Sequence, residues 1–410
     1  MNKNERNMSN TPRLRFPGFT GEWKEQPLSN FLFEHKTKSD GKCEVHSVSV
    51  SKGVINQVEY LGRSFAAADT SKYNLAKPND IIYTKSPTGD FPYGIVKQNK
   101  NPYNVIVSPL YAVYSPINKH IGYILDSYFE SSVNTNNYLS SLVQKGAKNT
   151  INITNDTFVS KDVCFPTDPA EQEKIASCLT EIDNLIAAQG QKVDALKEKK
   201  KGLMQQMFPQ AGETTPELRF PGFKGEWKER KLGDSFDERT EKNRGDLPLL
   251  SLGEEGLAYQ SETARKDNSN ADKSKYLRVA IGDIAYNTMR MWQGRCVYVN
   301  IEGIVSPAYT VCNPKKDIDS MFHFYLFKTH NMIALFHQHS QGLVSDTLNL
   351  KFEAFSKIKY FLPPTLAEQQ KIAECLSALD DTIESESEKL DAIKDYKKGL
   401  MQQLFPQPSK

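Results

Sequence analysis

The 410-residue sequence lacks the local patterns by which many catalytic and cofactor-binding proteins are recognised. It contains no Gly-x-x-x-x-Gly-Lys-Ser/Thr phosphate loop, no Gly-x-Gly-x-x-Gly dinucleotide turn, no His-Glu-x-x-His motif and no nucleophile elbow. Asn101-Pro102-Tyr103 approaches the Asn-Pro-Pro-Tyr core of amino-methyltransferases, but a proline is missing and no glycine-rich strand precedes it, so a turn before a strand is favoured. We therefore expect a non-catalytic protein that recognises a target and depends on other proteins for chemistry.

Features of disulfide-rich, zinc-binding and membrane proteins are also missing. The six cysteines include no Cys-x-x-Cys pair, which favours reduced thiols in a cytoplasmic protein. His323, His330 and His337 recur at a regular spacing, but no cysteine or carboxylate cluster accompanies them, so a partly exposed helix face is favoured over a metal site. Because no apolar run of about 18 residues is present, we expect no transmembrane helix and no membrane partner.

Charge of one sign is not in excess either. Lys and Arg number 52 and Asp and Glu number 50, which argues against a wholly basic surface but allows local basic clusters. Residues 1–10 are polar and lack the apolar segment of a signal peptide, so we expect a disordered tail there.

What the sequence does contain is two copies of the same framing segments. The front copies read LRFPGFTGEWKE at 14–25 and LRFPGFKGEWKE at 218–229. The rear copies begin AEQEKIASCL at 170 and AEQQKIAECL at 367, and they end KKGLMQQMFPQ at 210 and KKGLMQQLFPQ at 407. The segments between these frames are nearly unrelated. A constant frame around variable inserts suggests a fixed geometry that presents two different specificities.

The rear frames predict two long helices, at 168–208 and 365–407. Apolar residues recur with a sevenfold spacing, which indicates a coiled coil, and two such helices in one chain should pair antiparallel about a pseudo-twofold axis. Gln189 and Glu386 interrupt the seam, either to fix its register or as a locally wet stretch. Gly202 and Gly399 recur near the helix ends, which suggests close backbone approach or a bend. The residues expected to pair the helices are Ile175, Ile182, Gln189, Leu196, Leu203, Ile372, Leu379, Glu386, Ile393 and Leu400.

The inserts predict two globular domains of mixed α/β structure, at 11–167 and 209–364. Short strands are expected at 80–84 and 283–286, further strands at 105–114 and 304–311, and helical stretches at 121–143 and 322–339. The fold class is therefore α/β, with two mixed domains joined by two long antiparallel coiled-coil helices in an internal repeat.

The most divergent loops follow these strands and are the candidates for target recognition. Residues 287–295 read NTMRMWQGR, and a loop that combines arginines with an aromatic side chain suits base reading or backbone gripping. Its counterpart at 85–93 has fewer cations, and ordinary solvated turns remain the alternative for all of these loops. The candidate DNA-binding residues are Tyr83, Lys85, Lys145, Lys148, Asn149, Asn287, Arg290, Trp292, Arg295 and Gln341.

The layout of repeats and motifs resembles the DNA-specificity subunit of type I restriction–modification systems over essentially the whole chain. The resemblance implies two target recognition domains, each of which reads one half of a split, asymmetric site in double-stranded DNA. It implies that the helices act as a ruler and dock two methyltransferase (M) subunits, which motor-nuclease (R) subunits then join. It also implies that this chain binds no cofactor, because S-adenosylmethionine belongs to the methyltransferase partner and ATP with Mg to the motor. The loop at 85–93 departs from its counterpart because it lacks an arginine.

Two other classes of function remain as alternatives. A coiled-coil scaffold that reads no DNA would share the helices, and a self-sufficient DNA methyltransferase or nuclease is disfavoured because the catalytic motifs are missing.

Overall fold

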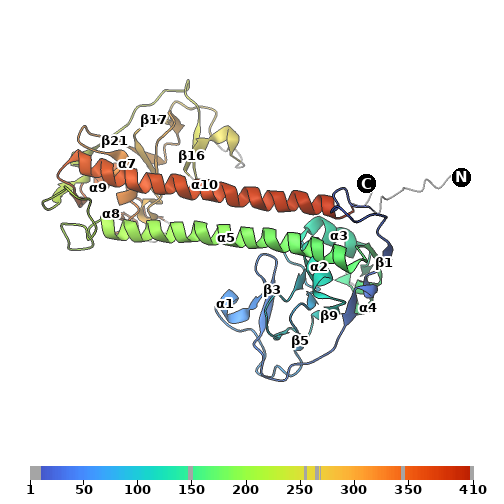
Figure 1. The fold of residues 1–410 in the computed structure, drawn as a ribbon. Helices are drawn as coiled ribbons and strands as arrows, with labels where there is room; N and C mark the ends of the chain where they lie inside the picture. The colour runs from blue at the N-terminus through green and yellow to red at the C-terminus, as the bar shows by residue number, and fades with distance from the viewer. Residues whose placement is uncertain are drawn as a thin grey trace. The chain divides into compact units, whose positions relative to one another are not determined.

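The computed structural model describes residues 11–145, 151–253, 256–263, 267, 269–342 and 347–406, and Figure 1 shows its elements. The chain divides into two compact units. Unit 1 comprises residues 1–189 and 389–410, and unit 2 comprises residues 190–388. Each unit therefore combines one of the two inserts with part of each long helix.

Unit 1 is built around a four-stranded antiparallel sheet in the order β2-β9-β6-β7. All residues of β6 and β7 are buried, because both faces of the sheet are covered. Ile81 and Tyr83 lie in a large core that includes α2, whereas Ile82 packs with Val113 in a smaller core on the other face. The elements of this insert are β1 (Glu25–Pro27), η1 (Leu28–Asn30), β2 (Leu32–Glu34), β3 (His46–Ser49), β4 (Gly53–Asn56), α1 (Gln57–Leu61), β5 (Asn74–Ala76), β6 (Ile81–Tyr83), β7 (Val96–Gln98), β8 (Val105–Val107), β9 (Ala112–Pro116), α2 (Lys119–Glu130), α3 (Ser132–Ser140), β10 (Gln144–Lys145), β11 (Ile151–Asn152), α4 (Asn155–Ser160) and β12 (Asp162–Cys164).

Unit 2 contains a four-stranded antiparallel sheet in the order β14-β21-β18-β19. Ile284 and Tyr286 of β18 face a large core, and Ala285 between them faces a smaller core. The elements of this insert are β13 (Lys228–Lys231), α6 (Leu232–Ser235), β14 (Phe236–Glu238), β15 (Leu250–Gly253), β16 (Gly256–Tyr259), η3 (Gln260–Glu262), β17 (Leu277–Val279), β18 (Ile284–Asn287), η4 (Met291–Gln293), β19 (Cys296–Tyr298), β20 (Gly303–Val305), β21 (Tyr309–Pro314), α7 (Ser320–Leu326), α8 (His330–His339), α9 (Phe352–Phe355) and β22 (Lys359–Leu362).

The two inserts thus share a topology despite their unrelated sequences. In each sheet, the second strand along the chain (β6 or β18) occupies the third position. It lies between its hairpin partner (β7 or β19) and the last strand along the chain (β9 or β21). This confirms the predicted mixed α/β class. The predicted strands at 105–114 and 304–311 were wrong in one respect, because each is two strands separated by a turn at Ser108-Pro109 or Ser306-Pro307. Proline cannot donate to a strand ladder, which accounts for both interruptions.

The long helices are α5 (Pro169–Met207) and α10 (Leu366–Leu404), each of 39 residues. In unit 1 the start of α5 packs against the end of α10, where Ile175 and Ile182 share a core with Leu400 and Leu404. In unit 2 the end of α5 packs against the start of α10, where Leu203 lies against the core that contains Ile372. The helices therefore pair antiparallel within each unit, as the fold class predicts.

All ten residues expected to pair the helices are buried or half-buried. Glu386 is buried, and its carboxylate lies 2.8 Å from Lys192 Nζ. Gln189 falls in unit 1 and Glu386 in unit 2, so a register-fixing contact between them stays a prediction. The prediction of close backbone approach at Gly202 and Gly399 was wrong, because a Cβ at either position would have no neighbour within 4 Å.

The front frame is fastened to the rear frame by a buried ion pair in each unit. Arg15 donates from Nε and Nη2 to the Glu171 carboxylate at 2.6 and 2.8 Å, and Trp23 Nε1 donates to the same carboxylate at 3.2 Å. In unit 2 Arg219 and Trp227 bind Glu368 in the same way, at 2.7, 2.8 and 3.3 Å. In each unit, the front and rear repeated segments are therefore held together by this ion pair, which we call the clamp. The sequence repeats alone did not reveal this contact.

The backbone reinforces each clamp. In unit 1 the N–H of Leu14 donates to the carbonyl of Gln403 near the end of α10, at 3.1 Å. In unit 2 the N–H of Leu218 donates to the carbonyl of Gln206 near the end of α5, at 2.9 Å. Each front frame is thus anchored both to the start of one long helix and to the end of the other.

None of the helices in the described part of the chain is long and apolar enough to cross a membrane. Over the same residues, no group of three or more His, Cys, Asp or Glu side chains is placed to hold a metal ion. His323, from the regularly spaced histidines, is buried, and its ring binds the Asp319 carbonyl and the Tyr360 hydroxyl.

Candidate nucleic-acid interface

The strongest candidate site lies where β18 of unit 2 ends. Asn287 closes this strand, and its side-chain oxygen accepts from the N–H of Met289 at 2.9 Å to start a turn. Met291 is buried in the core and fastens η4 to the domain, and Gly294 ends η4 with a φ of 72°. Glycine adopts this left-handed backbone conformation without strain because it has no Cβ. The loop is therefore a compact, anchored turn with Arg290 and Arg295 on its exposed side.

Trp292 supports this loop from within. Its Nε1 donates to the carbonyl of Met289 at 3.0 Å, and its ring packs 5.8 Å from the ring of His337 on α8. Trp292 is half-buried, and these contacts help to fix the loop. Its role as a DNA contact stays a prediction.

Arg290 has no acidic partner among the described residues. Several other arginines of unit 2 form short ion pairs, such as Arg239 with Asp283 at 2.6 Å and Arg278 with Glu302 at 2.6 Å. A guanidinium that is exposed can bind an external acceptor, in a forked geometry that suits guanine edges and phosphates.

Next to this loop is a hollow with a volume of about 470 Å³. Three cationic side chains line it, from Arg290, Arg295 and Lys328, and the lining described by the structure includes no acidic residue. Asn287 and Tyr309 add polar groups at the mouth of the β18–β21 ladder. The structure thus brings three of the predicted residues, Asn287, Arg290 and Arg295, to one basic hollow.

Sequence reasoning missed Lys328. It was expected to lie inside a continuous helix at 322–339, but the structure ends α7 at Leu326 and begins α8 at His330. The Thr329 side chain caps α8 by accepting from the N–H of Met332. A threonine at an N-cap position is a recognisable helix-start signal, and it would have exposed this break.

The last predicted residue of unit 2, Gln341, lies at the edge of the same region. Its backbone forms a two-way bridge with Asn349, at 2.8 and 2.9 Å, and its side chain is exposed. It does not line the hollow that contains Arg290.

Unit 1 presents a different surface at the corresponding end of its sheet. Lys85 follows β6, has a φ of 60°, and donates from Nζ to the Asn155 side chain. Burial lowers the pKa of Lys85, while the nearby Glu34 carboxylate acts in the opposite direction. Lys36 and Lys38, which sequence reasoning missed, share a hollow of about 190 Å³ with Lys85. This hollow is lysine-based, whereas that of unit 2 is arginine-based.

Tyr83 requires a correction. Its ring is 1% exposed, stacks on Phe158 at 4.5 Å, and its hydroxyl donates to the carbonyl of Tyr93 at 2.7 Å. It was predicted to bind DNA, but its side chain points into the core. Lys145 lies in the short strand β10, without a described side chain, and Lys148 and Asn149 lie outside the described residues.

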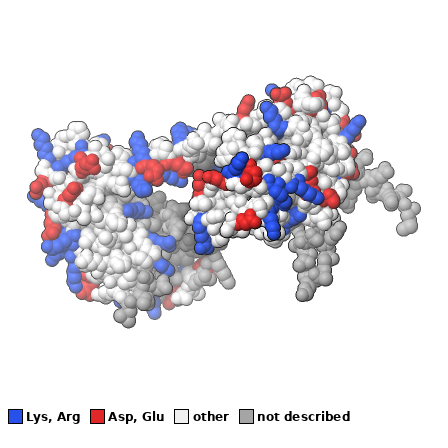
Figure 2. Space-filling view, turned by 90° about the horizontal axis from the view of Figure 1, so that it is seen from below, with Lys and Arg blue, Asp and Glu red and all other residues white. Residues whose placement is uncertain are grey.

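Over the face shown in Figure 2, basic and acidic side chains are interspersed, as expected for a formal net charge of +2. A basic hollow is therefore a local feature of the surface, in agreement with the balance of charge in the sequence.

The comparisons with known proteins point in one direction. A family model described as type I restriction modification DNA specificity domain matches residues 33–198 and again residues 224–395. A putative type I restriction enzyme MjaX specificity subunit from Methanocaldococcus jannaschii is 25% identical over 266 residues. That match covers 60% of this chain and 59% of the curated relative, so the chain spans less than two thirds of that protein's length.

One solved structure shows the same fold, and a second is more distantly similar. The S subunit of a type I restriction–modification system from M. genitalium has a TM-score of 0.59 and 13% identity, over 97% of this chain and 100% of that one. The HsdS subunit from Thermoanaerobacter tengcongensis has a TM-score of 0.43 and 11% identity, over 97% and 99% of the two chains.

Proposed function

The chain belongs to the family of type I restriction–modification DNA specificity proteins, and from this membership we propose that it is the specificity subunit of such a complex. In this role it performs no catalysis. Each unit reads one half of a bipartite site in double-stranded DNA in the cytoplasm. The observation that carries the proposal is that two units with one topology present different cationic hollows at the corresponding end of their sheets.

The chemistry of the two hollows suits different tasks. The guanidinium groups of Arg290 and Arg295 can bind guanine O6 and N7 in a forked geometry, which discriminates between bases. The ammonium groups of Lys36, Lys38 and Lys85 are point charges that suit phosphates and single acceptors. Different side chains on a shared scaffold would give the two halves of the site different sequences.

In this proposal the paired helices act as a ruler for the spacing of the half-sites and as a docking surface for partners. A helix of 39 residues extends about 58 Å at 1.5 Å per residue. In the proposed complex, two methyltransferase subunits dock on these helices and supply S-adenosylmethionine, and motor-nuclease subunits supply ATP hydrolysis with Mg. The chain itself holds neither cofactor in this proposal.

The test is to sequence the methylated sites in cells that express the chain with its methyltransferase partner. A bipartite adenine-methylated site is expected. Replacing residues 230–364 with the insert of a relative should change one half of that site and leave the other half and the spacer as they were. If both halves change, or if no methylated site appears with the intact complex, the proposal is wrong.

A further inference from the structure

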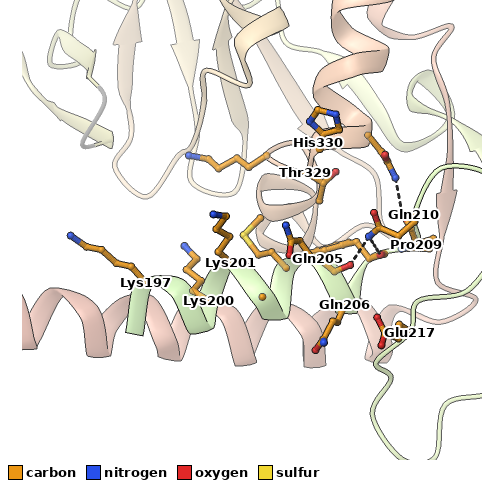
Figure 3. A pocket seen from close by; sticks show the side chains of 15 residues that line it. Lys197, Lys200, Lys201, Gln205, Gln206, Pro209, Gln210, Glu217, Thr329 and His330 are labelled. Atoms are coloured by element: carbon orange, nitrogen blue, oxygen red, sulfur yellow. Dashed lines mark hydrogen bonds between the residues drawn. The ribbon is translucent and has the colours of Figure 1, made fainter. Parts of the chain in front are cut away.

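A second hollow of unit 2 lies beside α5, and it is strongly basic. It has a volume of about 740 Å³ and is bounded by the last turns of α5 and by the connection between α7 and α8. Figure 3 shows Lys197, Lys200 and Lys201 rising from α5 toward the side on which Thr329 and His330 lie. Their spacing of three and four residues places them on one face of the helix.

The lysines around this hollow differ in how far their charge is neutralised. Lys200 is held by Asp380 at 2.5 Å and lies 5.1 Å over the ring of Tyr325, so its charge is used within the fold. Lys201 approaches Glu198 at 3.7 Å, but both side chains are well exposed, and such a pair contributes little. Lys197 has no acidic partner among the described residues.

Lys328 joins this hollow to the one that contains Arg290, because it lines both. Its ammonium lies 4.3 Å over the ring of Phe324 and has no carboxylate partner in the described part of the chain. Glu217 also lines the larger hollow, but Figure 3 places it at the end away from Lys197. Cations therefore continue from the arginine loop, through Lys328, to the exposed lysines of α5.

Lys397 of α10 in unit 1 is neutralised just as Lys200 is, so the two units differ instead at the residue before the following helix. Lys397, the repeat equivalent of Lys200, lies 2.6 Å from Glu130 and 2.7 Å from Asp183. Glu130 ends α2, whereas the residue that follows α7 closely in unit 2 is the cation Lys328. The basic continuation is thus a property of unit 2, and the framing repeat alone does not create it.

We propose that Lys197, Lys201 and Lys328 hold the phosphate backbone of the DNA next to the half-site that unit 2 reads. This inference rests on the proposed function and extends its DNA-binding surface from the insert onto the helix α5. Lysines bind phosphates as point charges and carry no base information, so these contacts strengthen binding equally for all sequences. DNA is favoured over an acidic protein segment because the lysines are continuous with the arginine hollow.

The test uses the full chain in complex with its methyltransferase partner. Lys197→Ala, Lys201→Ala, Lys328→Ala and the triple variant are titrated against specific and scrambled DNA at several salt concentrations. Each contact removed should lower the slope of log K against log salt by about 0.9, which makes affinity about 3.5-fold less sensitive to a fourfold rise in salt. Specific and scrambled DNA should weaken to the same extent, so the specificity ratio should not change.

A matched control keeps the interpretation sharp. Lys394 and Lys398 of α10 are the repeat equivalents of Lys197 and Lys201, and Lys394→Ala with Lys398→Ala should leave the salt slope unchanged. Melting curves and the size of each complex establish that the variants fold and assemble.

The possible outcomes separate the two proposals. If the triple variant keeps the original salt slope, the phosphate contacts do not exist. Loss of methyltransferase binding with an unchanged slope would assign the hollow to an acidic segment of that partner and overturn the inference. If the unaltered complex itself shows no preference for any DNA sequence, the proposed function fails instead.

Discussion

The clamp between the framing segments makes a quantitative prediction about stability. In unit 2 the Arg219 guanidinium donates two hydrogen bonds to the Glu368 carboxylate, whose side chain is 1% exposed. Arg219→Ala removes both bonds and leaves a buried carboxylate with only Trp227 Nε1 as its side-chain partner. Removing one member of a buried ion pair typically costs about 3–5 kcal/mol, because the remaining charge is uncompensated.

The assay is denaturant unfolding of the full-length chain, with hydrogen exchange to locate the loss of stability. Arg219→Ala should reduce protection in residues 190–388, and the repeat equivalent Arg15→Ala should reduce it in residues 1–189 and 389–410. Lys357→Ala is the control, since its i,i+4 pair with Glu353 is well exposed and its loss should leave the unfolding midpoint nearly unchanged.

A double variant tests the mechanism as well as the magnitude. Glu368→Gln removes the charge that Arg219→Ala would leave behind, so the double variant should be more stable than the sum of the two single losses predicts. Contacting residues show interaction free energies of roughly 0.5–3 kcal/mol in such cycles. Additive effects, or a loss below about 1 kcal/mol in Arg219→Ala, would mean that the buried pair does not hold the frames together.

Three further predictions concern recognition, spacing and pH. Arg290→Ala should weaken specific DNA binding by about 1–3 kcal/mol if the guanidinium contacts a base, without lowering the melting temperature. The control is Arg244→Ala, which should leave affinity unchanged because the Arg244 guanidinium already pairs with Asp246 at 2.8 Å. A lowered melting temperature with full affinity would remove Arg290 from the interface. One or two residues inserted near the middle of α5 should abolish methylation, because each residue adds about 1.5 Å and turns the helix by about 100°. An insertion near a whole number of turns should preserve activity best and lengthen the spacer between the half-sites. Activity that tolerates the small insertions would contradict the proposal that the helices set this spacing. Burial lowers the pKa of His323 to about 4 from an ordinary value of 6.5, so the unfolded chain binds the proton more readily than the folded chain. The free energy of unfolding should therefore fall as pH drops from about 6.5 to about 4, by up to about 1.4 kcal/mol per pH unit for this group. His323→Gln should flatten that slope when unfolding is followed across this range.

The helices and the mixed α/β class could be predicted because both rest on local periodicity. Heptad spacing of residues such as Ile175 and Ile372 depends only on neighbours along the chain, and it places them correctly on the buried seam. The breaks within the inserts were harder to predict, since the apolar stretch at 322–339 has no glycine or proline to mark its interruption. Only the capping role of Thr329 distinguishes two short helices from one long helix there.

The candidate site was predicted in part for the same reason. Arg290 and Arg295 stand out by residue type in a loop after a strand, whereas Lys328 reaches the same hollow from a distant segment and could be found only from the fold. Tyr83 shows the opposite error. It was listed as a DNA-binding candidate from the strand expected at 80–84, but covering of both sheet faces buries it, which a single sequence cannot show.

The repeated segments supply the buried side chains that stabilise each unit, whereas the inserts supply exposed side chains. The clamp side chains Arg15, Trp23 and Glu171 belong to the frames, as do their counterparts in unit 2, and they are buried or nearly so. The arginines of the basic hollow, Arg290 and Arg295, belong to an insert and are exposed. Because the buried groups that hold each unit together are outside the variable surface, side chains at the sheet end can change without leaving an unpaired charge in the core. A chain built in this way can acquire a new specificity in one unit while its clamps and helix seam stay intact.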